Sequence, residues 1–371
     1  MPPNLRLRQL QLLHRHGDRT PLHNVFRGSS VAADELDERK HWESQLPPTD
    51  ELVALRDKFA VLDETVRLPG SAPFQQRPFG YLTSRGIQQM TRRGERVRDF
   101  CGAADFDVDA VRAEDVQIFS NAYTRTQLSV QALLGGMLGP EPHVLPPVRV
   151  LPPETDIINT YAAFPEIMQL KAELEKDDAA FAAREHDMSR TKQELMLALP
   201  MFASGAVPFQ WMYAADYFMC RRAHDVAMLL GSESHANATV QHLGYRFSQF
   251  YSHRRILHLV AGRLMHNVLR EMKLAMADHP DKKRIVVYSG HDVSILSVLH
   301  AINASLTDDS TFWPDYSSAL ALELLEDDRG QWFVRARLDG EILALKQATS
   351  PVLQLGEFTD LVADGIGHAP P

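Results

Sequence analysis

A group of arginine and histidine side chains follows an apolar run near the start of the chain. Residues 5–13 predict a buried strand, and Arg15, His16 and Arg19 come just beyond its carboxyl end. In open α/β sheets, ligands bind beyond the carboxyl ends of the strands. Two guanidinium groups at such a place favour a planar or tetrahedral oxyanion, of which phosphate is the usual one. The sequence therefore indicates a phosphate site with an imidazole beside it.

A second stretch repeats this arrangement of a strand, a turn and a basic side chain. Residues 116–120 predict a strand, and residues 124–134 predict a helix that ends at Gly135-Gly136. Arg125 then lies in the first helical turn, directly beyond the end of the strand. That position favours a functional arginine over a solvated surface residue.

A third junction of the same kind lies far downstream. Residues 284–289 predict another buried strand, and residues 293–301 predict the helix that follows it. His291 and Asp292 occupy the turn between them. Because the carboxyl ends of parallel strands meet at one edge of a sheet, we expect the three junctions to lie together.

The three junctions resemble the motifs of the histidine acid phosphatases, branch 2 of the histidine phosphatase superfamily. Residues 15–21 resemble the family motif R-H-G-x-R-x-P, residues 120–129 resemble its segment with a further arginine, and residues 289–292 resemble its His-Asp pair. The resemblance implies a metal-independent phosphomonoester hydrolase that acts through a phosphohistidine intermediate. It covers the α/β parts of the chain and is weaker in the helical middle.

The resemblance also implies a role for each side chain. His16 would be the nucleophile, and Asp292 the general acid that later activates water. Like charges disfavour an imidazolium, so the surrounding guanidinium groups should lower the pKa of His16. The residues expected to bind the phosphate of the substrate are Arg15, Arg19, Arg125 and His291.

Asp18 stands at the variable position of the first motif. A carboxylate that faced the anion site would repel the substrate, so we expect it to point away and to pair with an arginine. Residues 220–224 resemble a segment of the family's cap, and we interpret His224 as structural. We expect no cofactor and no metal, because His14 and His16 lack carboxylate partners and no other ligand cluster stands out.

The elements that must position these residues predict an α/β fold: a three-layer sandwich with a mainly parallel central sheet and an inserted helical cap domain. We assign residues 1–150 and 244–371 to the α/β catalytic domain and residues 151–243 to the mainly helical cap. The polar, proline-punctuated residues 22–78 are interpreted as an excursion over the active-site face.

Further patterns predict the elements around this framework. Residues 82–100 predict a helix capped by Thr83 or Ser84, with a solvated arginine-rich face, and residues 247–276 predict one long helix. Two alternating runs, 319–325 and 332–338, predict a hairpin at the edge of the sheet.

Within the excursion, residues 35–43 and 51–62 predict two short helices and residues 70–73 a turn. In the cap, residues 210–230 predict a helix, and most of its aromatic residues, among them Trp211, Tyr217 and Phe218, are expected in the core.

Composition narrows the class of protein and of partner. The chain has 371 residues, 44% of them hydrophobic, and a net charge of −9, which argues against a nucleic-acid partner. Cys101 and Cys220 are expected to be free thiols. No segment is apolar enough to span a membrane and no signal peptide is evident, so we expect a cytoplasmic location unless the chain is a trimmed form of a secreted or organellar protein. The sequence carries no signal for the oligomeric state.

Several interpretations of the function stay open. The partner is expected to be a small phosphomonoester substrate, and the branch that resembles lysophosphatidic acid phosphatase is favoured because the cap is compact and poor in cysteine. A phytase is disfavoured, since secreted phytases usually carry several disulfides. The other alternative is a non-catalytic protein that binds phosphate, inositol phosphates or phospholipid headgroups, although every expected catalytic position is filled.

Overall fold

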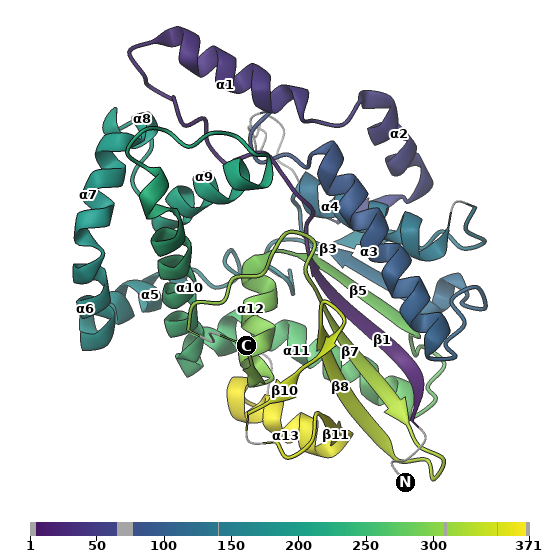
Figure 1. Ribbon diagram of the computed structural model, residues 1–371. Coiled ribbons are helices and arrows are strands. Elements are labelled where there is room, and N and C mark those ends of the chain that lie inside the picture. Colours follow the sequence, from purple (N-terminus) through teal and green to yellow (C-terminus); the bar gives the residue numbers. More distant parts are fainter. Residues whose placement is uncertain (1–4, 65–76, 140, 308–309, 347, 369–371) are drawn as a thin grey trace.

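A mixed central sheet carries the α/β part of the chain (Figure 1). The structure is a computed structural model that describes residues 5–64, 77–139, 141–307, 310–346 and 348–368. Its parallel strands are β1 (Arg6–Arg15), β2 (Val61–Asp63), β3 (Val116–Ser120), β4 (Val148–Val150) and β5 (Ile285–Gly290). Its antiparallel strands are β7 (Ala319–Glu326), β8 (Trp332–Leu338), β9 (Glu341–Ile342) and β11 (Val352–Gln354). A separate small ladder joins β6 (Ala304–Ser305) to β10 (Ala344–Leu345).

Strand β1 lies where the parallel and antiparallel halves meet. In the described residues the order is β11-β8-β7-β1-β5-β3-β4-β2, with β9 beside β8. His14 of β1 pairs with Ser289 of β5 on one side and with Ala319 of β7 on the other, and Ser120 of β3 also pairs with Ser289. The carboxyl ends of β1, β3 and β5 and the start of β7 therefore share one edge of the sheet.

Helices cover both faces of the sheet, which confirms the predicted layers. Successive residues of β5 point to opposite faces. Ile285 and Val287 pack in the core beneath α3 (Ser84–Ala103) and α4 (Thr124–Leu138). Val286 and Tyr288 pack in the core beneath α11 (Arg254–Met276) and α12 (Asp292–Ala301). A strand buried on both faces reads as a continuous apolar run, as the sequence of β5 does.

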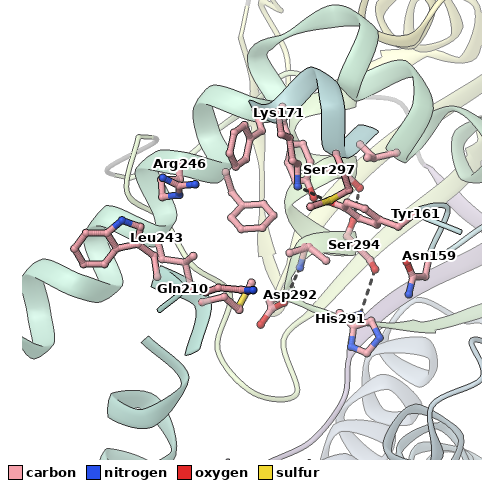
Figure 2. Close-up of a pocket in the computed structure, with 18 of the residues that line it drawn as sticks. Asn159, Tyr161, Lys171, Gln210, Leu243, Arg246, His291, Asp292, Ser294 and Ser297 are labelled. Atoms are coloured by element: carbon pink, nitrogen blue, oxygen red, sulfur yellow. Dashed lines mark hydrogen bonds between the residues drawn. The ribbon is translucent and has the colours of Figure 1, made fainter. Parts of the chain in front are cut away.

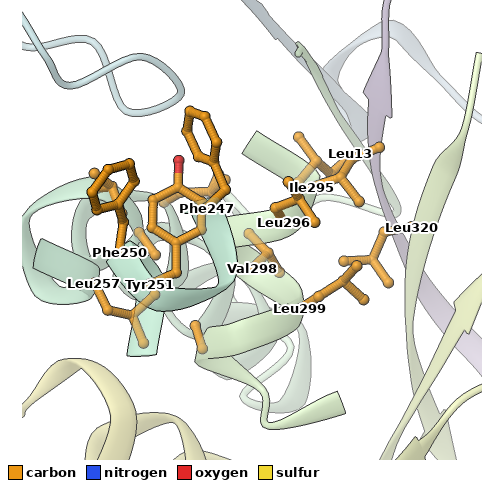
Figure 3. Close-up of a cluster of buried hydrophobic side chains, with 14 of the residues drawn as sticks. Leu13, Phe247, Phe250, Tyr251, Leu257, Ile295, Leu296, Val298, Leu299 and Leu320 are labelled. Carbon is orange, nitrogen blue, oxygen red and sulfur yellow. The ribbon is translucent and has the colours of Figure 1, made fainter. Parts of the chain in front are cut away.

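The core beneath α12 continues into the helical region beside the sheet. Figure 3 shows Leu13 and Leu320 of the strands against Ile295 and Leu299 of α12, with Phe247 on the far side. The helices of that region are α5 (Glu166–Asp177), α6 (Ala179–Asp187), α7 (Ser189–Ala198), α8 (Pro200–Ala203), α9 (Trp211–Ala223) and α10 (Ala236–Ser252), with a short 3₁₀ turn at Glu233–His235. Helix α10 crosses residue 243, where we placed the end of the cap, and the domain division stays a prediction.

Two predicted helices differ from the structure for local reasons. The helix predicted over 247–276 is two helices, α10 and α11, because His253 is extended and its ring accepts from the Ile256 N–H to cap α11. The helix predicted over 210–230 ends at Ala223. Residues 226–229, which lie beyond it, are not helical.

The excursion carries α1 (Ala32–Ser44) and α2 (Thr49–Lys58), and its residues 65–76, with the predicted turn at 70–73, lie outside the described residues. Instead of continuing the second helix, residues 61–63 form β2, because they pair with β4 at the edge of the sheet. The predicted hairpin is β7 and β8, and α13 (Leu355–Ile366) follows the short strand β11 that extends the sheet beyond it.

Helix α4 does not end at Gly135-Gly136, as predicted, but runs on to Leu138. Gly136 serves helix packing rather than termination. A Cβ atom added at Gly136 would lie 2.0 Å from the carbonyl oxygen of Thr91 in α3, whereas one at Gly135 would meet nothing within 4 Å. The absent side chain at Gly136 thus lets the two helices touch through their backbones.

We expect Gly136→Ala to destabilise the protein by about 1–3 kcal/mol or more, because the new methyl group must push α3 away. Gly135→Ala is the matched control, and it should be neutral or stabilising by up to about 1 kcal/mol, since alanine favours a helix. Urea unfolding followed by circular dichroism would measure both. Equal effects at the two positions would contradict the packing argument.

Candidate active site

The three predicted junctions meet at the shared edge of the sheet and border one cavity of about 700 Å³. His16 follows β1, Arg125 lies in the first turn of α4, and His291 precedes α12. The His16 N–H donates to the Gly290 carbonyl at 3.1 Å, and the rings of His16 and His291 have centroids 5.4 Å apart. Figure 2 shows His291 and Asp292 at one end of this cavity. The structure therefore brings together residues that are about 275 positions apart in the chain, His16 and His291.

The His16 ring is buried with its proton fixed on one nitrogen. Nδ1 lies 2.8 Å from the Gly17 carbonyl oxygen, and a carbonyl only accepts, so Nδ1 carries the hydrogen and Nε2 holds a lone pair. Burial, together with the positive charges of Arg125 and Arg15, holds the pKa of His16 well below its usual value. Both effects favour a neutral ring with a free Nε2.

Gly17 is needed because the motif loop lies against α3. A Cβ atom at Gly17 would lie 2.4 Å from the Gly86 carbonyl oxygen, and its N–H donates to Ser129 Oγ at 3.0 Å. The backbone that holds the His16 ring is therefore fixed between α3 and α4.

Three buried guanidinium groups surround the His16 ring. Arg15, Arg19 and Arg125 are each less than 7% exposed, and their positive charges contribute to the lowered pKa of His16. The Nε atom of each makes no hydrogen bond within the described part of the chain. Buried N–H groups without partners cost free energy, and Arg19 and Arg125 line the cavity together with His16, so these groups indicate a site for an oxyanion.

Each guanidinium is held at its other end by a different segment. Arg15 donates from Nη1 to the Pro314 carbonyl at 2.5 Å, and its Nη2 lies 3.0 Å from Asp292 Oδ2. Arg125 lies over the Tyr123 ring at 4.3 Å and donates weakly to the Gly80 carbonyl at 3.4 Å. Burial, with the nearby charge of Arg19, lowers the pKa of Arg125 to about 9.

Arg19 is held by the cap, through a residue that sequence reasoning missed. Its Nη1 lies 2.6 Å from Oδ1 of Asp216 in α9, and both side chains are about 95% buried. Burial alone would lower the pKa of Arg19, but the Asp216 carboxylate raises it well above its usual value. The other oxygen of Asp216 accepts from the Leu22 N–H at 2.6 Å. A lone aspartate among aromatic residues gives no sequence signal for this pairing.

His291 has a fixed tautomer because of Asn121, another residue that sequence reasoning missed. The Asn121 Oδ1 accepts from the Tyr123 N–H and from Thr126 Oγ1, so its Nδ2 donates to His291 Nε2 at 2.7 Å. The proton of the ring is therefore on Nδ1. Burial and the charges of Arg125 and Arg19 hold the pKa of His291 well below its usual value. The signal for Asn121 was its place directly after β3.

Asp292 begins α12 at the edge of the cavity. Its Oδ1 accepts from the Val293 N–H at 2.9 Å, and its Oδ2 faces Arg15. The side chain is 11% exposed, so one carboxylate can reach both the cavity and the arginine beside His16. This geometry suits proton exchange with a group bound at the phosphate site.

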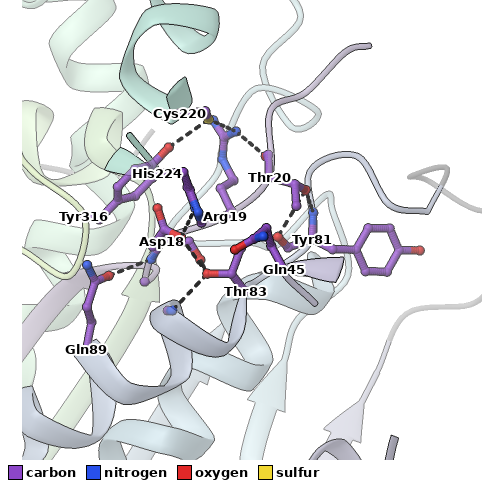
Figure 4. A network of polar contacts seen from close by, with 12 residues as sticks. Asp18, Arg19, Thr20, Gln45, Tyr81, Thr83, Gln89, Cys220, His224 and Tyr316 are labelled. Atoms are coloured by element: carbon purple, nitrogen blue, oxygen red, sulfur yellow. Dashed lines mark hydrogen bonds and ion pairs between the residues drawn. The ribbon is translucent and has the colours of Figure 1, made fainter. Parts of the chain in front are cut away.

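Asp18 points away from the cavity, but its expected pairing with an arginine is wrong. Figure 4 shows its carboxylate between Thr83 and His224, where Oδ2 accepts from Thr83 Oγ1 at 2.5 Å and lies 2.6 Å from His224 Nε2. His224 also packs edge-on against the Trp42 ring of α1. Thr83 caps α3, as predicted, by accepting from the Gly86 N–H. Asp18 thus joins the motif loop to α3 and to the cap.

The loop before β7 closes the site beneath Arg15. The Tyr316 ring lies 4.2 Å from the Arg15 guanidinium, and its hydroxyl is 3.2 Å from the Cys220 thiol. Ser317 donates to the His16 carbonyl and accepts from Arg93, which also pairs with Asp339 at 2.7 Å. Arg93 therefore departs from the predicted solvated face of α3.

Aromatic side chains form the far wall of the cavity. Several of them come from the helical region: Tyr161, Phe209, Trp211, Phe247, Phe250 and Tyr251. Trp211, Tyr217 and Phe218 are buried in the core, as expected, and Trp211 also lines this wall. The cavity thus has a cationic end and an aromatic end.

Both cysteines, Cys101 and Cys220, are free and buried, as expected. Within the described residues, no group of three or more His, Cys, Asp or Glu side chains is arranged to hold a metal ion. The same residues contain no helix with the length and apolarity that crossing a membrane requires.

Comparison with known proteins places these features in a family. A family model described as histidine phosphatase superfamily (branch 2) matches residues 6–199 and 213–339. Counting factor 60 of Dictyostelium discoideum is 22% identical over 95% of this chain and 85% of its own. Lysophosphatidic acid phosphatase type 6 of Homo sapiens is 23% identical over 91% of this chain and 78% of its own.

The fold also matches solved structures. The Hafnia alvei phytase in complex with myo-inositol hexakis sulphate aligns with a TM-score of 0.64 at 15% identity, over 99% of this chain and 98% of that one. At this identity the likeness shows the fold.

We expect the His16 ring to remain neutral at pH 5, where an ordinary histidine with a pKa near 6.5 is mostly charged. The sign follows from burial and like charges, which both disfavour the proton. Nitrogen-15 NMR of histidine-labelled protein would show a neutral ring at this pH, with the signal assigned by its loss in His16→Ala. A His16 signal that titrates above pH 6 would show that the guanidinium groups do not act on it as described.

Proposed function

We propose that His16 carries the phosphoryl group between the two steps of phosphomonoester hydrolysis. The chain belongs to branch 2 of the histidine phosphatase superfamily and is a phosphomonoester hydrolase. The state of the ring is the observation that supports this role. Nδ1 donates to the Gly17 carbonyl, and burial among guanidinium groups disfavours the imidazolium. A neutral ring has a lone pair on Nε2 to attack phosphorus, and a charged ring has none.

In the proposed first step, Nε2 forms a bond to phosphorus while the bond from phosphorus to the ester oxygen breaks. The unpartnered N–H groups of Arg15, Arg19 and Arg125 bind the non-bridging oxygens and stabilise their charge. A protonated Asp292 gives its proton to the leaving alkoxide. The bond from Nδ1–H to the Gly17 carbonyl stabilises the positive charge that the ring acquires.

In the proposed second step, the Asp292 carboxylate takes a proton from water, which attacks the phosphohistidine. The bond from phosphorus to Nε2 breaks, inorganic phosphate forms, and the ring returns to its neutral state. Arg15 lies between the two reacting groups, since it contacts Asp292 and borders His16. Arg15 can therefore hold Asp292 and His16 in a fixed position relative to each other. His291, whose Nδ1 carries its proton, is proposed as a further donor to phosphate.

For the substrate, we propose a phosphomonoester with an apolar organic part, of which a single-chain acyl glycerol phosphate such as lysophosphatidic acid is the first candidate. The aromatic wall of the cavity supports this class, because it offers contact area for a hydrocarbon chain. The resemblance to a relative named lysophosphatidic acid phosphatase type 6 supports it independently. A phytase is less well supported, because both cysteines are free thiols, whereas secreted phytases usually carry several disulfides. A cytoplasmic location remains our proposal, supported by the two free thiols.

The roles of Asp292 and His16 can be separated by the leaving group. Asp292→Asn should slow formation of the phosphoenzyme by about a hundredfold to ten-thousandfold with alkyl phosphates, because an alkoxide needs the proton. With nitrophenyl phosphate the first step should slow much less, and phosphoenzyme should accumulate because the base of the second step is missing. Rapid quench into alkali with labelled phosphate would measure both steps.

His16→Ala is the control for this experiment, and it should trap no labelled protein while keeping its fold by circular dichroism. Labelled protein in His16→Ala would place the nucleophile elsewhere. Equal slowing of the first step for both leaving groups in Asp292→Asn would show that Asp292 is not the acid.

We expect activity toward nitrophenyl phosphate to survive prolonged dialysis against EDTA, because three guanidinium groups supply the charge that a divalent ion provides in other phosphoryl-transfer enzymes. The rate should change less than twofold, measured against an undialysed sample. Loss of activity that Mg²⁺ or Zn²⁺ restores would contradict the proposed site.

A further inference from the structure

Lys171 of α5 places a buried ammonium group in the aromatic wall of the cavity. The residue is 7% exposed, and its Nζ donates to the Tyr161 hydroxyl at 2.6 Å. The ammonium also lies over the rings of Phe247 and Phe250 at 4.6 and 4.7 Å. Figure 2 shows Lys171 beside Tyr161, in the same cavity as Asp292. A charged group thus stands among the aromatic side chains of the cavity wall.

No carboxylate pairs with this ammonium in the described part of the chain. The two glutamates that share the cavity, Glu175 and Glu185, are both paired with Arg246. Burial of an unpaired charge is costly, and contact with aromatic faces offsets only part of that cost. An ammonium has three N–H donors, and the Tyr161 hydroxyl takes one. Two donors are left at the wall of the cavity.

Lys171 and the reacting end border the same space. The cavity that Lys171 lines is also lined by His16, His291 and Asp292. The ammonium lies 5.9 Å from the centre of the Tyr251 ring, which lines this cavity too. A ligand in the cavity can therefore contact the phosphate site and Lys171 together.

We propose that Lys171 is a specificity-determining residue whose ammonium donates to the ester carbonyl oxygen of an acyl glycerol phosphate. The proposal rests on the proposed function and adds to it the chemical group that the wall of the cavity recognises. A plain hydrocarbon chain would need only the aromatic faces, and a buried charge beside it would weaken binding. An oxygen acceptor placed between the phosphate and the chain uses the two spare donors.

The matching pair of substrates differs only in this carbonyl. This pair consists of a short acyl glycerol phosphate and an alkyl-ether glycerol phosphate of equal chain length. Both are used below the concentration at which they aggregate. A hydrogen bond to a charged group predicts that wild-type protein prefers the acyl compound by about tenfold to a hundredfold in kcat/KM. Lys171→Met, which keeps the length and apolar character of the stem, should bring the acyl-to-ether ratio close to one.

Two further variants show whether the effect belongs to the buried charge. Lys192→Met removes an exposed lysine that borders the same cavity, and it should keep the wild-type ratio. Lys171→Arg keeps a cationic donor and should retain part of the preference. Because each ratio is taken within one protein preparation, loss of folded protein cancels out.

The outcomes separate this inference from the proposed function. An acyl-to-ether ratio near one in wild-type protein, or one unchanged in Lys171→Met, would overturn the role of Lys171 while leaving acyl glycerol phosphates as substrates. Hydrolysis of nitrophenyl phosphate but of neither lipid would reject that substrate class and the inference with it. Equal acyl-to-ether ratios in Lys171→Met and Lys192→Met would show that the two lysines of the cavity act alike. That result would also refute a specific role for Lys171.

Discussion

Mutual repulsion among three buried guanidinium groups is the constraint on which the rest of this structure depends. Arg15, Arg19 and Arg125 surround one imidazole, and their N–H groups that are free for phosphate are shut off from water. The protein must hold these charges together before any substrate arrives. It does so with partners from separate regions, of which Asp292, Asp216 and the Pro314 carbonyl are the strongest. The site is therefore preorganised by the whole fold rather than by its motif loops alone.

The same charges explain why the proposed nucleophile is a histidine with a lowered pKa. An imidazolium in this position would add a fourth positive charge, so the arginines proposed to bind phosphate also keep His16 neutral. In the proposed mechanism, phosphate binding and activation of the nucleophile are therefore one electrostatic effect. Asp292 shares in it, since its contact with Arg15 couples the proposed proton donor to the same cluster.

The sequence was sufficient to predict the parts of the site that lie on local patterns. His16, Arg125 and His291 each follow an apolar strand. Both the hydrophobic pattern of a strand and the turn residues after it can be recognised from a few neighbouring residues. Asn121 lies directly after β3, where a site residue is expected, but its pairing with His291 could not be predicted, because the two residues are about 170 positions apart in the chain. The pairing of Asp216 with Arg19, about 200 positions apart, could not be predicted for the same reason. Gly136 was misread as a helix end, since its use depends on a second helix, α3, that approaches it. The aromatic pattern predicted correctly that Trp211 is buried in the core, but it could not show that Trp211 also lines a cavity, because such a pattern does not distinguish a filled interior from the wall of a cavity.

The ion pair between Asp216 and Arg19 has a consequence for how this protein could be re-engineered or could diverge. The helical region looks like an exchangeable module, because it is inserted between β4 and β5 and supplies the aromatic wall. Yet Asp216 in α9 holds Arg19 of the proposed phosphate site, and His224 at the end of that helix holds Asp18 of the motif loop. A chimaera with a foreign helical region would therefore keep the arginine cluster intact only if α9 of this protein were retained. The helices on either side of α9 are the part that is free to vary, because they line the cavity, whereas the contact to Arg19 comes from α9.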